Sequence, residues 1–261
     1  MSSNQTNISS NVVNLDELIE RVTTFGVKYN PVRSEFTIPQ LTALKTLAET
    51  AIGHVQTAEN IDKNSIAARS LAFKDTDGLV TRAINSFHIS GASEQSIQQA
   101  ESKVRTYRSI RASEKPTSEE IAAAKAEGKE LRINVQHNAT FDKKIENFTD
   151  FIDFLANSSQ YGPNETDIAV DGLTAKLAEL KTQNSNCSKT LAELDAARLT
   201  RDIVMFTDVT GLVDIAMGVK KYVKSAFGAT SIQYKSISDL RFRKIKKIAS
   251  QSLPESEPIP R

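Results

Sequence analysis

An internal repeat constrains the fold of this chain more than any other feature of its sequence. Motifs in the first half return in the second half in the same order, and the offset between them changes only near loop signals. The matches pair positions 29–31 with 161–163, 41–43 with 173–175 and, after one inserted residue, 78–80 with 211–213. Such self-similarity is typical of a duplicated supersecondary unit.

The composition indicates that the repeated unit is helical. Ala, Leu, Lys and Glu are plentiful, whereas the chain has only 10 Gly and 7 Pro, and aromatic residues make up 6%. Straight-chain side chains lose little rotamer freedom in a helix, and Gly and Pro interrupt it. We therefore predict an all-α fold. The predicted architecture is an elongated antiparallel helical bundle built from two tandem copies of a helical-hairpin unit.

The repeat also predicts the boundaries along the chain. We expect two repeats that pack as one domain, joined by a linker and flanked by flexible ends. The segments are a disordered tail at 1–13, helical repeat 1 at 14–112, a linker at 113–140, helical repeat 2 at 141–249 and a flexible tail at 250–261.

Turn and cap signals divide each repeat into helices. In repeat 1 a long helix is expected to end near Phe73 and a separate helix to begin at Leu79, and Ser93 resembles the N-cap of the next helix. In repeat 2 a long helix is expected at 168–203 and a following one at 212–227, closed by a glycine.

The long helix of repeat 2 carries the clearest heptad pattern. Its positions alternate by steps of four and three, which keeps one seam facing a partner helix, as in a coiled coil. The seam consists of Leu173, Leu177, Leu180, Asn184, Cys187, Leu191 and Leu194. Asn184 is either a polar device that fixes register or partner choice, or a point where the seam is partly exposed. The single cysteine rules out an internal disulfide and fits a reduced, structural thiol.

Two polar positions recur between the repeats. Arg69 returns as Arg201, and Asp75 returns as Asp208. They could form a binding pocket with one arginine per half, or a repeated ion pair that ties the long helix to its neighbour. We favour the structural ion pair, because repeats preserve architecture first.

The sequence carries no catalytic or metal-binding motif above background. His54, His88 and His137 share no ligand spacing with one another or with Cys187, whereas a zinc site needs clustered ligands. We therefore expect a non-enzymatic protein without a catalytic site, a metal site or a cofactor. The pattern identifies no small-molecule ligand.

A basic stretch near the C-terminus is the strongest electrostatic feature of a chain whose net charge is only +1. We call its candidate interaction residues the basic patch: Lys220, Lys221, Lys224, Arg241, Arg243, Lys244, Lys246 and Lys247. Such a patch could bind the phosphates of nucleic acid or an anionic membrane surface. It could also pair with an acidic face of the same protein or of a neighbouring subunit, and residues 146–195 are rich in carboxylates.

The heptad seam and the opposed charges favour a structural or protein-interaction role, with self-association into a homo-oligomer. Nucleic-acid binding and membrane activity are the alternatives. No stretch reaches the length of about 18 apolar residues that a membrane-spanning helix needs, and the N-terminal segment lacks a signal-peptide pattern. The expected location is therefore the cytoplasm.

Three motifs of the second half resemble a bacterial protein family, common in Bacteroidetes, that has no assigned activity. They are Tyr-Gly-Pro-Asn-Glu at 161–165, Thr-Gly-Leu-Val-Asp at 210–214 and the run at 219–229. The resemblance extends over about residues 15–248. It implies a bacterial origin and a duplicated helical fold, and it implies no site residue.

Overall fold

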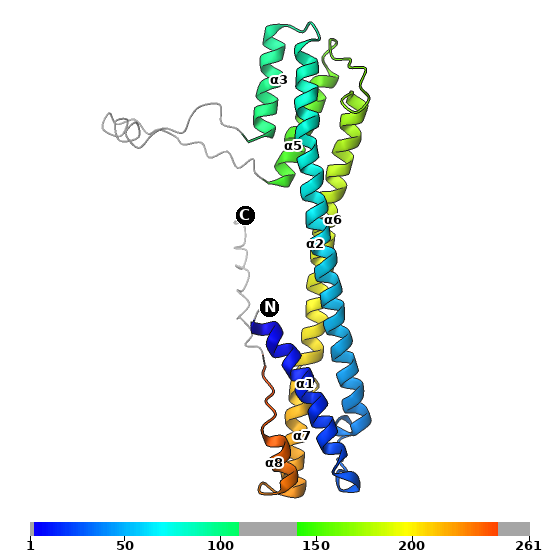
Figure 1. Ribbon diagram of the computed structural model, residues 1–261, viewed down its shortest axis with the longest axis vertical. Coiled ribbons are helices and arrows are strands. Elements are labelled where there is room, and N and C mark those ends of the chain that lie inside the picture. The colour runs from blue at the N-terminus through cyan, green and yellow to red at the C-terminus, as the bar shows by residue number, and fades with distance from the viewer. Residues whose placement is uncertain (1–2, 110–139, 245–261) are drawn as a thin grey trace, which may run out of the picture. The chain divides into compact units, whose positions relative to one another are not determined.

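The computed structural model describes residues 3–109 and 140–244, and every regular element in these two ranges is a helix. The α-helices are α1 (Ser3–Thr23), α2 (Ile38–His88), α3 (Glu94–Tyr107), α5 (Phe141–Ala156), α6 (Val170–Phe206), α7 (Leu212–Phe227) and α8 (Ile232–Ser238) (Figure 1). Two 3-10 turns, η1 (Gly26–Lys28) and η2 (Ser34–Phe36), lie between α1 and α2. The all-α prediction is confirmed. Within the described ranges no helix combines the length and apolar character needed to cross a membrane.

The described residues form two compact units, and each unit takes residues from both halves of the chain. Unit 1 comprises residues 3–60 and 193–244, and unit 2 comprises residues 61–109 and 140–192. The expectation of two repeats in one domain is therefore replaced by two units, each built from part of each repeat. The reason is that α2 and α6 contribute to both units: Glu59 contacts Arg198 in unit 1, and Ser65 contacts Thr190 in unit 2.

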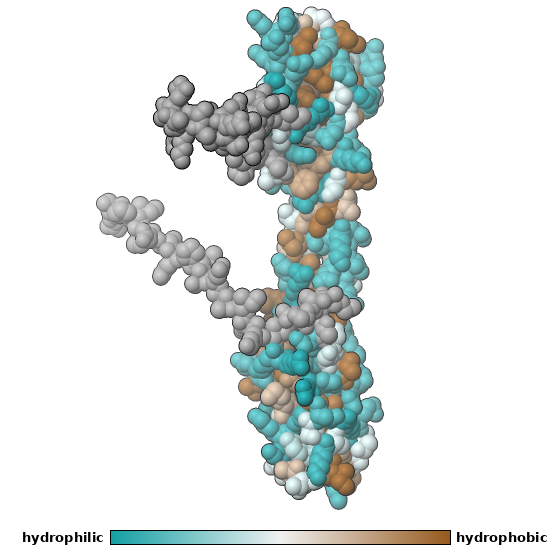
Figure 2. All heavy atoms as spheres, turned by 60° about the vertical axis from the view of Figure 1, so that its left-hand side comes forward, coloured by the Kyte–Doolittle hydropathy of each residue, from teal (hydrophilic) through white to brown (hydrophobic). Residues whose placement is uncertain are grey.

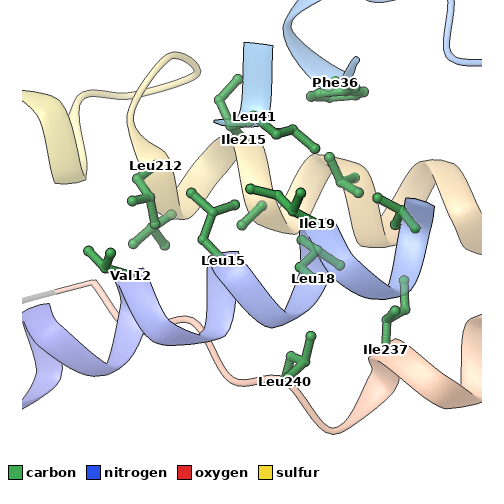
Figure 3. Close-up of a cluster of buried hydrophobic side chains, with 14 of the residues drawn as sticks. Val12, Leu15, Leu18, Ile19, Phe36, Leu41, Leu212, Ile215, Ile237 and Leu240 are labelled. Atoms are coloured by element: carbon green, nitrogen blue, oxygen red, sulfur yellow. The ribbon is translucent and has the colours of Figure 1, made fainter. Parts of the chain in front are cut away.

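The core of unit 1 forms where α1 packs against α7 (Figure 3). Apolar residues of α1 recur at helical spacing and project from one face toward the facing side chains of α7, α8 and the start of α2. The labelled members of this core are Val12, Leu15, Leu18, Ile19, Phe36, Leu41, Leu212, Ile215, Ile237 and Leu240. The first and the last described helices of the chain therefore share one hydrophobic core.

The predicted disordered tail at 1–13 is wrong from residue 3 onward, because α1 begins at Ser3. Ile8, Asn11 and Val12 are buried in unit 1. The many polar residues of this segment conceal a stripe that is buried by residues far along the chain. Asn11 tolerates burial because its side chain is hydrogen-bonded to the backbone of Arg243. The predicted flexible tail at 250–261 and the linker at 113–139 lie outside the described residues, and Thr140 caps α5.

The core of unit 2 is richer in aromatic residues. Phe148 and Phe151 of α5, Phe87 of α2 and Tyr107 of α3 are fully buried. The Phe87 and Phe154 rings meet edge-on with centroids 5.8 Å apart, a favoured aromatic geometry. Helix α3 enters this core from its predicted N-cap, whose hydroxyl accepts a hydrogen bond from the Ser96 N–H at 3.2 Å. The sequence assignment of that cap is confirmed.

The expected break between Phe73 and Leu79 does not occur, since α2 continues unbroken to His88. Thr76 is fully buried within the helix and donates its hydroxyl hydrogen to the Ala72 carbonyl, so this polar residue needs no turn. The inserted residue in the second half has the opposite effect. Helix α6 ends at Phe206, Val209 adopts φ 72°, and α7 begins at Leu212.

The predicted seam on α6 is buried at five positions, and Leu191 is the error. Buried members of the seam are Leu173, Leu177, Leu180, Cys187 and Leu194. Leu191 is 50% exposed. Its neighbour Thr190 faces α2 instead and hydrogen-bonds Ser65 at 2.8 Å and Asp62 at 3.0 Å. A straight helix drifts out of a strict seven-residue repeat, which turns a late seam position away from its partner.

Alanine substitution at two leucines of α6 separates the buried part of the seam from the exposed part. Leu180→Ala removes a fully buried side chain in unit 2, and we expect it to lower the free energy of unfolding by about 2–5 kcal/mol. The matched control, Leu191→Ala, should change it by less than about 0.5 kcal/mol. Urea unfolding followed by circular dichroism measures both. Equal losses for the two variants would contradict the observed orientation of α6.

Candidate anion-binding pocket

An open pocket of about 480 Å³ lies in unit 1 and gathers half of the predicted basic patch. Its lining combines four cationic side chains with an apolar floor: Met217, Lys220, Lys221, Ser238, Leu240, Arg241, Phe242 and Arg243. The structure therefore brings Lys220, Lys221, Arg241 and Arg243 together, as the sequence stretch suggested. Lys246 and Lys247 lie outside the described residues.

Helix α7 supplies one wall of the pocket because it is amphipathic. Val219 and Val223 are fully buried, which leaves Lys221 and Lys224 exposed on the other side. Gly228 then ends the helix with φ 90° and ψ 153°, a conformation that is essentially restricted to glycine. Ser231 caps α8, and its hydroxyl accepts a hydrogen bond from the Tyr234 N–H at 3.1 Å. This turn brings α8 back against α7.

The other wall is the short segment after α8, and two asparagines of α1 hold its backbone. The Asn11 side chain accepts a hydrogen bond from the Arg243 N–H at 2.9 Å and donates one to the Arg243 carbonyl at 2.8 Å. Asn14 donates to the Arg241 carbonyl at 2.7 Å. Sequence reasoning missed both residues. Their only signal was a pair of amides, one turn apart, beside an apolar helical stripe.

Lys220 acts as a structural cation at the base of the pocket. Its ammonium donates hydrogen bonds to the carbonyls of Ser238 at 3.1 Å and Leu240 at 2.6 Å. Burial lowers the pKa of the Lys220 ammonium, and the nearby Asp239 carboxylate opposes that shift. The side chain thus ties the segment after α8 to α7.

Lys244 and Lys224 also have partners within unit 1. Lys244 forms ion pairs with Asp208 at 3.1 Å and Asp214 at 2.9 Å. Lys224 lies 5.6 Å from the centroid of the Tyr234 ring, within cation–π range. Lys221, Arg241 and Arg243 differ from these residues, because in the described part of the chain no carboxylate lies within salt-bridge distance of them. These three exposed cations are the ones available to a ligand.

The repeated ion pair predicted for Arg69, Asp75, Arg201 and Asp208 is wrong. Asp208 binds Lys244, Arg201 binds its neighbour Asp202 at 2.7 Å, and Asp75 is exposed. The different partners follow from the different backbones, because α2 continues past Asp75 whereas α6 ends before Asp208.

Arg69 takes part in a polar network in unit 2. It donates to the Asn184 side-chain oxygen at 3.1 Å, and its guanidinium lies 4.1 Å from the centroid of the Phe141 ring. Asn184 in turn donates to Asp142 at 2.6 Å. Asn184 is therefore half-buried and hydrogen-bonded to both α2 and α5, which fits a polar residue that fixes the position of neighbouring helices.

Other polar groups give no second candidate site. Among the described residues no group of three or more His, Cys, Asp or Glu could hold a metal ion. Burial raises the pKa of Tyr161 to about 12 and also raises the pKa values of Tyr29 and Tyr107, so these phenols stay protonated at neutral pH. Comparisons with protein-family models, curated proteins and solved structures found no match to this chain.

The two asparagines of α1 should contribute unequally to stability. Asn11→Ala leaves the buried N–H and carbonyl of Arg243 without their partner, and we expect a loss of about 1–3 kcal/mol in the free energy of unfolding. Asn14→Ala removes one more exposed hydrogen bond and should cost about 0.5–1.5 kcal/mol. Urea unfolding compares the two variants. An Asn11→Ala variant as stable as the unsubstituted chain would refute the anchoring role.

The ion pair of Asp214 predicts an acid dependence of stability. Hydrogen bonds from Lys244 and from the Val209 N–H lower the pKa of the Asp214 carboxyl in the folded state. A lowered pKa means that this contribution is fully present above the ordinary value of 3.8 and is lost as the pH falls through the folded-state pKa. The raised pKa of Lys244 keeps that side chain charged over the same range.

Asp214→Asn should therefore lower the melting temperature at pH 7, and the difference from the unsubstituted chain should shrink toward pH 3. Asp75→Asn, which alters an exposed carboxylate of unit 2, is the control and should melt like the unsubstituted chain. A difference that does not shrink in acid would show that ionisation of Asp214 does not matter.

Proposed function

We propose that this chain is a non-enzymatic helical interaction protein that binds a polyanionic partner through the pocket of unit 1. One observation carries the proposal: Lys221, Arg241 and Arg243 converge on an open pocket, and no neighbouring carboxylate in the described chain pairs with them. Phosphate groups bound by such cations release condensed counterions, which drives association. The net charge of +1 makes this attraction local rather than a property of the whole chain.

Charge removal at the pocket tests this function. Inorganic polyphosphate serves as the probe, and isothermal titration calorimetry at about 50 and 200 mM salt measures its affinity. We expect binding that weakens about tenfold or more between these salts, and that R241Q/R243Q abolishes. K63Q/K74Q, which removes two exposed charges from unit 2, is the matched control and should bind normally. Equal affinities of the two double variants would reject the pocket as the binding site.

The proposal includes a duplicated, antiparallel helical architecture. The Tyr29 hydroxyl donates to the Phe36 carbonyl at 2.6 Å, and the Tyr161 hydroxyl donates to the Ile168 carbonyl at the same distance and the same sequence separation. Both tyrosines belong to the repeated motif found in the sequence. In unit 2, contacts between Ser65 and Thr190, Arg69 and Asn184, and Arg82 and Asp167 run in opposite directions along the chain, which supports antiparallel packing.

Removing the two tyrosine hydroxyls tests the equivalence of the repeats. Tyr29→Phe and Tyr161→Phe each leave one carbonyl without its donor, and we expect each to lower the free energy of unfolding by about 0.5–1.5 kcal/mol. Tyr234→Phe is the control, since its hydroxyl makes no hydrogen bond to the described residues. A loss for one repeat and none for the other would contradict a shared structural role.

Self-association is a second proposed function, favoured by an exposed apolar stripe on α6. Leu199 and Ile203 are 64% and 56% exposed and lie four residues apart, so they share one face of the helix within unit 1. Hydrophobic side chains also reach the surface among hydrophilic ones in Figure 2. A second copy of the chain would cover this stripe, and acidic and basic segments of two copies would add attraction.

Light scattering coupled to size exclusion, at low and high salt, tests self-association. We expect an oligomer that Leu199→Lys combined with Ile203→Lys dissociates, because two charges cannot be buried at an apolar contact. Dissociation by salt alone would assign the assembly to opposed charges instead. A 28.7 kDa monomer at both salts would exclude this second function.

The proposal also keeps the cytoplasmic location and the bacterial family resemblance. The location rests on the single cysteine, Cys187, which is buried and free. The resemblance rests on the motifs at 161–165, 210–214 and 219–229. An anionic membrane surface is the alternative polyanion for the same cations.

A further inference from the structure

The wall of the pocket formed by residues 239–243 alternates between exposed and buried side chains. Asp239, Arg241 and Arg243 are exposed, whereas Leu240 is buried and Phe242 is partly buried against the core of unit 1. This period of two is that of an extended chain, in which every second side chain points to the same side. Arg241 and Arg243 therefore lie on one side of the segment.

This extended segment is held in place before any ligand arrives. Side chains of Asn11, Asn14 and Lys220 hydrogen-bond its backbone from Ser238 to Arg243. A fixed backbone reduces the ordering that binding would otherwise require, so more of the contact energy appears as affinity.

The two arginines have the spacing of neighbouring phosphates. At about 3.3 Å per residue, alternate positions of an extended chain lie about 6.6 Å apart. That separation is comparable with the distance between successive phosphates of an extended nucleic-acid strand. Each guanidinium offers a planar fork of donors that matches phosphate oxygens.

The apolar floor of the pocket distinguishes between polyanions. Met217 is 42% exposed, and Phe242 lies between the two arginines in the sequence; both line the pocket. A volume of about 480 Å³ has room for one unpaired base. Polyphosphate has no group to fill this floor, and the bases of a duplex are stacked inside it. Unpaired bases on an aromatic ring beside cations are the common mode of single-strand binding.

A second cation and ring extend the same pattern along α7. Lys221 lines the pocket, and Lys224 lies one helical turn further on beside the Tyr234 ring. Side chains three residues apart on a helix are neighbours on its surface. A strand leaving the pocket past Lys221 would meet this second pair.

From these observations, and resting on the polyanion binding proposed above, we infer that the pocket of unit 1 binds single-stranded nucleic acid. Arg241 and Arg243 contact successive phosphates, and an unpaired base lies against Phe242 and Met217.

Fluorescence anisotropy of the full chain with a labelled oligothymidylate of about 12 nucleotides tests this inference. We expect tighter binding to the single strand than to a duplex of the same length. R241Q/R243Q should weaken binding about tenfold or more and reduce the salt slope by about 1.4, since each phosphate contact in a single strand contributes about 0.7. K63Q/K74Q should bind like the unsubstituted chain.

Phe242→Leu separates base contact from charge. It keeps an apolar side chain in the core but removes the ring, and we expect oligothymidylate binding to weaken about fivefold or more while polyphosphate binding stays unchanged. Phe242→Tyr, which keeps the ring, should restore oligothymidylate binding. Urea unfolding of each variant confirms that both remain folded.

Two results would overturn the inference and leave polyanion binding intact: equal affinity for duplex and single strand, or equal effects of Phe242→Leu on oligothymidylate and polyphosphate. Binding to phosphatidylserine vesicles without binding to oligothymidylate would overturn it in favour of a membrane partner. Failure to bind oligothymidylate, polyphosphate and vesicles alike would reject both the inference and the proposed function.

Discussion

The packing of α1 against α7 is the interaction on which the rest of unit 1 depends. Leu15 and Leu18 of the first helix are fully buried in the same core as Leu212 and Ile215 near the other end of the described chain (Figure 3). Burial of apolar surface is non-directional, so it brings these helices together without specifying much detail. The detail comes from polar groups carried into the core by the same contact. Asn11 and Asn14 reach the backbone after α8 only because α1 lies beside α7 and α8.

This arrangement connects stability with the proposed binding function. A buried amide is costly unless its hydrogen bonds are made, and Asn11 makes them with the N–H and carbonyl of Arg243. The same bonds fix the backbone that carries the two pocket arginines. Lys220 acts similarly, because its ammonium binds two carbonyls rather than facing the solvent. Some charges of the basic patch therefore build the site, and the exposed ones, Lys221, Arg241 and Arg243, are left to contact a ligand.

Features governed by local chemistry were predictable. The all-α fold, the cap at Ser93, the glycine at the end of α7 and the bounds of α7 all follow from helical periodicity and from residues within one or two turns. Features governed by distant partners were not. The polar segment before Leu15 is helical because residues at the other end of unit 1 bury it, and Leu191 turns outward because Thr190 faces α2. The break expected near Gly78 is absent because the inserted residue that ends α6 has no counterpart in α2.

The sequence by itself determined the helical class, most helix ends and the collection of basic residues at the end of the second half, since each depends on neighbours along the chain. Only the tertiary structure decided which of those charges form a site. Ion pairs with Asp208 and Asp214 take up Lys244, and backbone carbonyls take up Lys220. The partners of a charge, and therefore its availability, depend on side chains that folding brings close in space, and their distance in sequence carries no record of that proximity.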